Sequence, residues 1–280
     1  MMLNAGIHRP DGIILDLEDS VAYQKKQEAR YLVRNALAKV NFYGAERMVR
    51  INQLPEGLED LEFIIPYNTH VVLIPKCESA EMVKAVEKRT REIQKAVGKK
   101  GEVYFMPIIE SCKGVEHAYG MATASKNIIA LAIGLEDLTA DLGVSRTEEG
   151  NESLYARTRV VNACKASGIQ PIDSVYSDVA NTEGLLANVR RSKALGFEGM
   201  GCIHPRQIPV IHEGFRPDPK EIEKARKIIE AFNEAEAKGL GVVSLVSKMI
   251  DPPVVKRAQQ TMRLVEVLGL EETNISKQNI

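Results

Sequence analysis

The chain has 280 residues, which is enough for one α/β barrel or for two smaller domains. Its 37 lysines and arginines nearly balance its 38 aspartates and glutamates, so no overall electrostatic field favours nucleic acid or an anionic membrane surface. No apolar run approaches the roughly 20 residues that span a bilayer. We therefore expect a protein with neither nucleic-acid nor membrane partners, which recognises its ligands through local sites.

The four cysteines are widely separated and lack the spacing of metal ligands. No secretory signal accompanies them, so we interpret Cys77, Cys112, Cys164 and Cys202 as reduced thiols. This pattern predicts a cytoplasmic protein.

Segments typical of strands and of helices alternate from the start of the chain, which indicates repeated βα units and a parallel sheet. Helices are predicted over 29–40 and 83–97, where apolar residues recur every three or four positions. Ser153 and Thr182 are predicted N-caps, and Gly168 and Gly196 are predicted to end helices. Short apolar runs predict seven strands, at 13–17, 48–51, 71–75, 103–109, 128–133, 172–175 and 199–203.

Seven strands are one fewer than a TIM (β/α)₈ barrel requires, and residues 1–6 resemble the end of a helix. We therefore expect an α/β fold with a TIM-barrel catalytic domain over 1–212, whose first strand is missing from this chain. The alternation stops after Pro205, and amphipathic helices are predicted around 220–238 and 254–268. These helices predict a C-terminal helical extension over 213–280.

Polar residues follow nearly every predicted strand, and in a barrel these positions converge on one face. They are Asp16, Glu18, Asp19, Arg50, Asn52, Lys76, Glu110, Glu136, Asp137, Ser174 and His204. A single polar residue after a strand is ordinary, because loops are polar. Their recurrence at strand after strand favours a functional site.

Glu110 and Asp137 each follow a strand, with no His or Cys beside them. Oxygen ligands of this kind suit a hard cation such as Mg²⁺. The alternative is a buried ion network in which the two acids pair with Arg50 and Lys76. His204 is either a base or a structural histidine, and we expect Asp141 to brace its loop rather than bind metal.

Six motifs, in order along almost the whole chain, resemble the family of citrate lyase β-subunits and malyl-CoA lyases, the HpcH/HpaI aldolases. They are DLEDSV at 16–21, VRIN at 49–52, LIPK at 73–76, PIIE at 107–110, GLEDL at 134–138 and GCIHP at 201–205. The segment KMIDPP at 248–253 extends the resemblance, which is greatest to the β-subunits. The family is a trimer-forming TIM barrel that binds Mg²⁺, so the resemblance implies a homotrimer and a Mg²⁺ cofactor here.

The resemblance also implies roles for individual residues. Glu110 and Asp137 match the metal ligands, and Arg50 matches the arginine that holds the substrate carboxylate and polarises oxygen. The backbone of Glu136 and Asp137 matches the segment that contacts a keto-acid carboxylate. Asp251 resembles an acid that some members lend to a neighbouring subunit's site. A second shell of acids behind the metal is matched by Asp16, Glu18 and Asp19.

The implied reaction cleaves a citryl thioester, carried on acyl carrier protein or CoA, to oxaloacetate and an acetyl thioester such as acetyl-CoA. The implied partners are citrate lyase α and γ subunits. The sequence leaves two alternatives open. One is a stand-alone malyl-CoA or citramalyl-CoA lyase, and the other is a non-catalytic scaffold subunit of a lyase complex.

Overall fold

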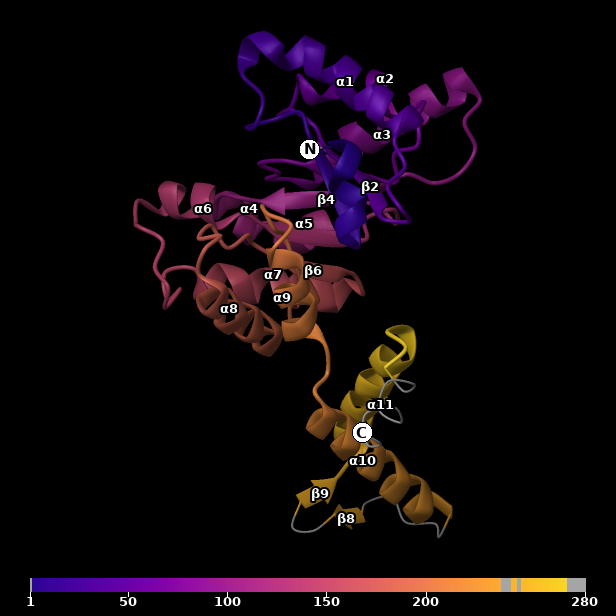
Figure 1. Cartoon of the computed structure of the whole chain (residues 1–280), viewed down its shortest axis with the longest axis vertical. Coiled ribbons are helices and arrows are strands. Elements are labelled where there is room, and N and C mark those ends of the chain that lie inside the picture. The colour runs from indigo at the N-terminus through magenta and orange to yellow at the C-terminus, as the bar shows by residue number, and fades with distance from the viewer. Residues whose placement is uncertain (1, 238–242, 246–247, 271–280) are drawn as a thin grey trace. The chain divides into compact units, whose positions relative to one another are not determined.

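A computed structural model describes residues 2–237, 243–245 and 248–270 of the chain (Figure 1). The chain forms two compact units, Met1–Phe215 and Arg216–Ile280, and each is considered by itself. Among the described residues, no helix is both long and apolar enough to cross a membrane.

The first unit contains a seven-stranded sheet in which every neighbouring pair of strands is parallel and the order along the sheet follows the order in the chain. Parallel strands that follow one another with right-handed crossovers carry their helices on one face, and the sheet curls away from them. The strands are β1 Gly12–Asp16, β2 Glu46–Arg50, β3 Val71–Ile74, β4 Tyr104–Ile109, β5 Ala130–Ile133, β6 Gln170–Asp173 and β7 Gly199–Met200.

Helices pack around the outside of this curled sheet, with α1 and α2 on one side of the unit and α7 and α8 on the other (Figure 1). Two short 3₁₀ helices, Met2–His8 and Tyr23–Lys25, lie near the start of the chain. The α-helices are α1 Lys26–Lys39, α2 Gly57–Ile64, α3 Ala80–Val97, α4 Cys112–Glu116, α5 Ala118–Ala122, α6 Leu135–Leu142, α7 Leu154–Ser167, α8 Thr182–Leu195 and α9 Gln207–Phe215.

The central strands β3 and β4 are buried on both faces, as expected for parallel strands, whereas the inner face of β1 is partly exposed at Ile14. In β4, Phe105 and Ile109 belong to the large core between sheet and helices. Met106 and Ile108, which alternate with them, belong to a smaller cluster on the inner face of the curl. This alternation determines which side chains at the strand ends point inward.

All seven predicted strands are present, although the sixth lies two residues earlier than predicted, at β6, and the seventh, β7, ends three residues earlier than predicted. Gly168 and Gly196 end α7 and α8 in the left-handed conformation, as predicted. The prediction that Thr182 caps α8 is wrong, because the side chain of Asn181 accepts the hydrogen bond from the Gly184 N–H. Helix α9 was not predicted.

The second unit contains helices α10, Pro219–Ala237, and α11, Pro252–Val267, as predicted for the C-terminal part of the chain. They pack together through a small apolar cluster that includes Ala225, Ile228 and Val255. Strands β8, Val243–Leu245, and β9, Lys248–Ile250, form an antiparallel pair that was not predicted.

Candidate active site at the carboxyl ends of the strands

Alternation along the strands brings acidic and basic side chains to the inner face of the sheet at its carboxyl edge. Ile13 and Leu15 pack outward in β1, so Asp16 at the end of that strand points inward. By the same period of two, Arg50 shares the inward face of β2 with Met48. Glu110, directly after Ile109, faces inward beyond β4.

Arg50 and Asp16 form a two-pronged ion pair. Arg50 Nε donates to Asp16 Oδ1 at 2.7 Å, and Nη2 donates to Oδ2 at 2.6 Å. Burial alone would raise the pKa of Asp16, but hydrogen bonds from Arg50, from Ser20 and from the Glu18 N–H lower it to about 2. The same pair raises the pKa of Arg50 against the effect of burial, so both groups are charged at neutral pH.

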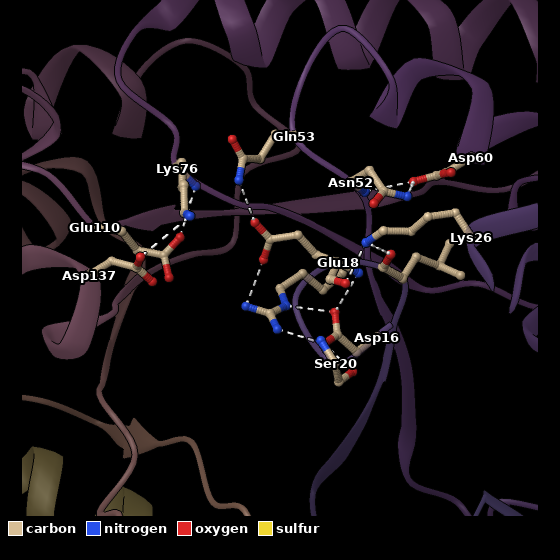
Figure 2. A network of polar contacts seen from close by, with 12 residues as sticks. Asp16, Glu18, Ser20, Lys26, Asn52, Gln53, Asp60, Lys76, Glu110 and Asp137 are labelled. Atoms are coloured by element: carbon tan, nitrogen blue, oxygen red, sulfur yellow. Dashed lines mark hydrogen bonds and ion pairs between the residues drawn. The ribbon is translucent and has the colours of Figure 1, made fainter. Parts of the chain in front are cut away.

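Glu18 stands on the other side of the Arg50 guanidinium. Its side chain is buried, and Arg50 Nη1 lies 2.9 Å from its Oε2. Gln53 Nε2 donates to its Oε1 at 3.1 Å, and Figure 2 shows the Gln53 amide pointing toward Glu18. Burial raises the pKa of Glu18, partly opposed by the charge of Arg50. Arg50 is therefore held in a fixed plane between two carboxylates.

Glu110 is the most enclosed acid at this edge, with 7 % of its surface exposed. Its Oε2 accepts a hydrogen bond of 2.9 Å from the Lys76 N–H. Its other oxygen lies against Gly134, where a Cβ would come within 2.5 Å of Oε1. Burial raises the pKa of Glu110, the negative charges of Glu18 and Asp137 add to this, and the Lys76 N–H opposes it.

Helix α6 carries Asp137 in its first turn and begins directly after Gly134. The start of this helix is anchored by Ser174, whose Oγ accepts the Leu135 N–H at 3.1 Å. Asp137 Oδ1 lies 3.4 Å from Lys76 Nζ, and its side chain is 43 % exposed. Figure 2 shows Glu110 and Asp137 side by side with Lys76 above them.

The side chain of Glu136 has a different environment from that of Asp137. It is exposed and pairs with Arg146 Nη1 at 2.8 Å. Arg146 Nη2 also donates to the Val175 carbonyl at 2.8 Å, so this arginine ties the loop after α6 to the loop after β6. This ion pair involves only the side chain of Glu136. The expected contact between the backbone of this segment and a keto-acid carboxylate stays a prediction.

Glu110 and Asp137 form a donor set that fits a divalent cation. Both supply hard carboxylate oxygens, and the buried Glu110 has no ion-pair partner within the described part of the chain. No group of three or more His, Cys, Asp or Glu side chains in the described ranges is arranged to hold a metal. A cation bound by these two acids would therefore keep coordination positions for water or substrate oxygens, as Mg²⁺ commonly does.

The ion network that the sequence left open is present in part. Asp137 pairs with Lys76, whereas Arg50 pairs with Asp16 and Glu18 and not with the proposed metal ligands. The other charged residues that follow the strands have local contacts and do not contact the proposed metal ligands. Asp141 lies in α6, and its Oδ2 accepts the Cys112 N–H at 2.7 Å, so it braces the start of α4 rather than its own loop. Asp19 is exposed, and His204 Nδ1 accepts the Arg206 N–H.

Asp251 belongs to the second unit, where its Oδ1 caps α11 by accepting the Val254 N–H at 3.1 Å. Its expected catalytic role stays a prediction. The supporting roles of Gly134, Gln53 and Arg146 were not predicted from the sequence, although Gly134 belongs to the motif at 134–138. Only Gly134 had a signal, because a glycine directly between a strand and a carboxylate-bearing helix suggests a close backbone approach.

The chain is similar to known proteins of one family. Residues 1–205 match the family model described as HpcH/HpaI aldolase/citrate lyase. Citrate lyase subunit beta of Haemophilus influenzae is 43 % identical over 262 residues, covering 92 % of this chain and 90 % of that protein.

Two solved structures from Mycobacterium tuberculosis are also similar. Protein CitE in complex with magnesium, acetoacetate and coenzyme A has a TM-score of 0.76 and 29 % identity, covering 91 % of this chain and 90 % of that one. Citrate lyase beta subunit complexed with oxaloacetate and magnesium has a TM-score of 0.62 and 32 % identity, covering 74 % and 87 %. The chain therefore belongs to the HpcH/HpaI aldolase/citrate lyase family.

Proposed function

We propose that this chain is a Mg²⁺-dependent carbon–carbon lyase that cleaves a citryl thioester to oxaloacetate and an acetyl thioester. The observation that carries the proposal is the position of the fixed Arg50 guanidinium at the same sheet edge as the Glu110–Asp137 pair. The choice of substrate is supported by the similarity of the chain to a citrate lyase subunit beta and to proteins solved with magnesium and a keto acid.

In the reaction, the tertiary hydroxyl of the citryl group loses its proton while the adjacent C–C bond breaks. The hydroxyl oxygen becomes the keto oxygen of oxaloacetate, and the bonding electron pair forms the enolate of the acetyl thioester, which then takes up a proton. Mg²⁺ held by Glu110 and Asp137 would act as a Lewis acid toward the oxygens of the substrate.

Arg50 has spare hydrogen-bonding capacity for an anionic substrate oxygen. A guanidinium has five N–H donors, and two of them are used by Asp16 and one faces Glu18. Two donors on its Nη atoms thus remain, and 21 % of the side chain is exposed. Lysine could not reproduce this fixed, multidentate arrangement.

The reaction also needs groups that transfer protons and groups that bind the keto-acid carboxylate. We assign the carboxylate to the backbone at Glu136 and Asp137, in the first turn of α6, where free N–H groups favour anions. We assign proton transfer at the hydroxyl or the acetyl methyl to an acid, with Asp251 as the candidate. Asp16 and Glu18 hold Arg50, and together with Asp19 they form the acidic second shell of the proposed site.

The wider assembly follows the same proposal. The curled sheet over 1–212 would be the greater part of a TIM-like barrel, followed by the helical extension 213–280. We further propose a homotrimer in the cytoplasm that works with citrate lyase α and γ subunits. The acyl group would be presented on acyl carrier protein or on CoA.

Purified protein incubated with citryl-CoA, citryl-acyl carrier protein, malyl-CoA and citramalyl-CoA tests the proposal. We expect oxaloacetate to be released from a citryl thioester, and only when Mg²⁺ is present. Faster cleavage of malyl-CoA or citramalyl-CoA would instead identify a stand-alone CoA-thioester lyase. No cleavage of any of the four, together with no binding of Mg²⁺ and oxaloacetate, would identify a scaffold subunit.

A further inference from the structure

Lys76 contacts both proposed metal ligands, each through a different part of the residue. Its backbone N–H donates to Glu110 Oε2 at 2.9 Å, and its Nζ lies 3.4 Å from Asp137 Oδ1. Figure 2 shows both contacts meeting at the pair of carboxylates. Within the described ranges, no other residue forms a hydrogen bond or ion pair with both acids, so Lys76 links β3 to the acids that follow β4 and β5.

The backbone of Lys76 is also unusual. Its φ is +45°, a left-handed conformation that side chains with a Cβ seldom adopt and that glycine adopts freely. Conformations of this kind cost on the order of 1 kcal/mol and cluster at functional sites. A lysine at such a position indicates that its side chain has a use that glycine would not provide.

The charges around Lys76 indicate the role of its side chain. Four carboxylates at this edge, Asp16, Glu18, Glu110 and Asp137, take part in its charged contacts, and Arg50 is engaged by the first two. Lys76 Nζ is the cation that faces Asp137. The two side chains are 35 % and 43 % exposed, and ion pairs with such exposure are weak and exchange readily. This contact can therefore be replaced by a stronger cation at little cost.

We propose that the Lys76 ammonium is a built-in counterion for the metal site, which occupies Asp137 before a divalent cation binds and leaves it when the cation arrives. The inference rests on the proposed function, because it takes Glu110 and Asp137 as the cation's ligands. Lys76 is thus a positioning residue, which keeps two repelling carboxylates in place and lowers the cation affinity of the site.

The cation affinity of the site can be measured by titrating the cation-free protein with Mn²⁺ and monitoring the loss of the EPR signal of the free ion. Lys76→Met removes the charge and keeps most of the side-chain length, so we expect Mn²⁺ to bind about tenfold more tightly, because like charges at short range repel. Lys76→Arg keeps the charge and should bind Mn²⁺ as wild type does. Lys76→Gln is a second neutral variant and should reproduce the gain if Lys76→Met does not fold.

Lys165→Met is the matched control. Lys165 and Glu198 form an ion pair with 46 % and 43 % exposure, next to the amino ends of β6 and β7, away from the proposed ligands. Its loss should leave Mn²⁺ affinity unchanged. A residue with a merely structural role would lower the affinity when replaced, so the expected gain separates the two roles.

Thermal unfolding gives a second readout. Without divalent cation, Lys76→Met should melt at a slightly lower temperature than wild type, because Asp137 loses its counterion while Glu110 keeps its hydrogen bond from the backbone N–H. Saturating Mn²⁺ should then raise its melting temperature by more than it raises that of wild type. Unchanged or weaker Mn²⁺ binding in both neutral variants would overturn the role of Lys76 alone. A wild-type protein that binds no Mn²⁺ would overturn this role and the proposed function together.

Discussion

The Glu110 carboxylate lies directly against the backbone of Gly134, where a Cβ would stand 2.5 Å from Oε1 and 2.7 Å from Cγ. The strand end that carries one proposed ligand thus packs on the residue that starts the helix carrying the other. Glycine is required here for space and not for backbone conformation, because its φ of −108° and ψ of 110° are open to any residue.

Gly134→Ala should therefore displace the Glu110 carboxylate without straining the backbone. We expect a loss of Mg²⁺ affinity and a fall in kcat of one order of magnitude or more, since small displacements of reacting groups are costly. Calorimetric Mg²⁺ titration and steady-state kinetics check this. Gly120→Ala is the control, because a Cβ at Gly120 meets nothing within 4 Å, and it should leave both quantities unchanged.

Arg50→Lys should lower kcat by about 10²- to 10³-fold, the usual effect of removing a donor that stabilises developing negative charge. The lysine cannot keep the two-pronged contact with Asp16 and also present N–H groups to the substrate. Arg89→Lys, at an exposed ion pair with Glu62 and Glu92, should have no effect on rate. A rise in KM with kcat unchanged would make Arg50 a binding residue only.

Asp16→Asn should change how stability depends on pH. The pKa of Asp16 is about 2 in the folded protein against an ordinary value of 3.8. Its contribution is present above pH 3.8 and is lost as the pH falls toward 2, and it amounts to about 2 kcal/mol. Urea unfolding of wild type and variant should therefore differ most at neutral pH and converge near pH 2. A difference that persists unchanged at pH 2 would contradict the ion-pair account.

Ser174→Ala should disturb the site from outside it. The change leaves the buried Leu135 N–H without its acceptor, which costs about 1–3 kcal/mol. It should also loosen the first turn of α6, so kcat should fall together with the melting temperature. Asn181→Ala removes the cap of α8, which carries none of the proposed ligands, and should lower the melting temperature while kcat is kept.

The sequence predicts the parallel sheet well because each strand is a short apolar run, and the helices between the strands have apolar residues at every third or fourth position. Helix α9 escaped prediction because Pro209 and Gly214 usually break helices. Pro209 is tolerated because it lies in the first turn, where the backbone N–H has no partner within the helix. The β8–β9 pair escaped because its three-residue strands are too short to show alternation.

The candidate site was predictable as a set of strand-end charges, and the pairing among them was not. Alternation along β1, β2 and β4 brings Asp16, Arg50 and Glu110 to one face. That Arg50 pairs with Asp16 and Glu18, while Lys76 reaches Asp137, depends on the separation between strands and on the left-handed turn at Lys76. Such relationships come from tertiary packing, which local sequence patterns do not encode.

The central claim is that Glu110 and Asp137 hold the cation that this lyase requires, and the rate of oxaloacetate release from citryl-CoA or citryl-acyl carrier protein tests it most directly. We predict that EDTA abolishes release by the wild type and that added Mg²⁺ restores it. Glu110→Gln and Asp137→Asn, which keep shape and remove charge, should each be slower by at least about 100-fold while remaining folded. Near-normal, Mg²⁺-dependent release by the folded double variant would contradict the account.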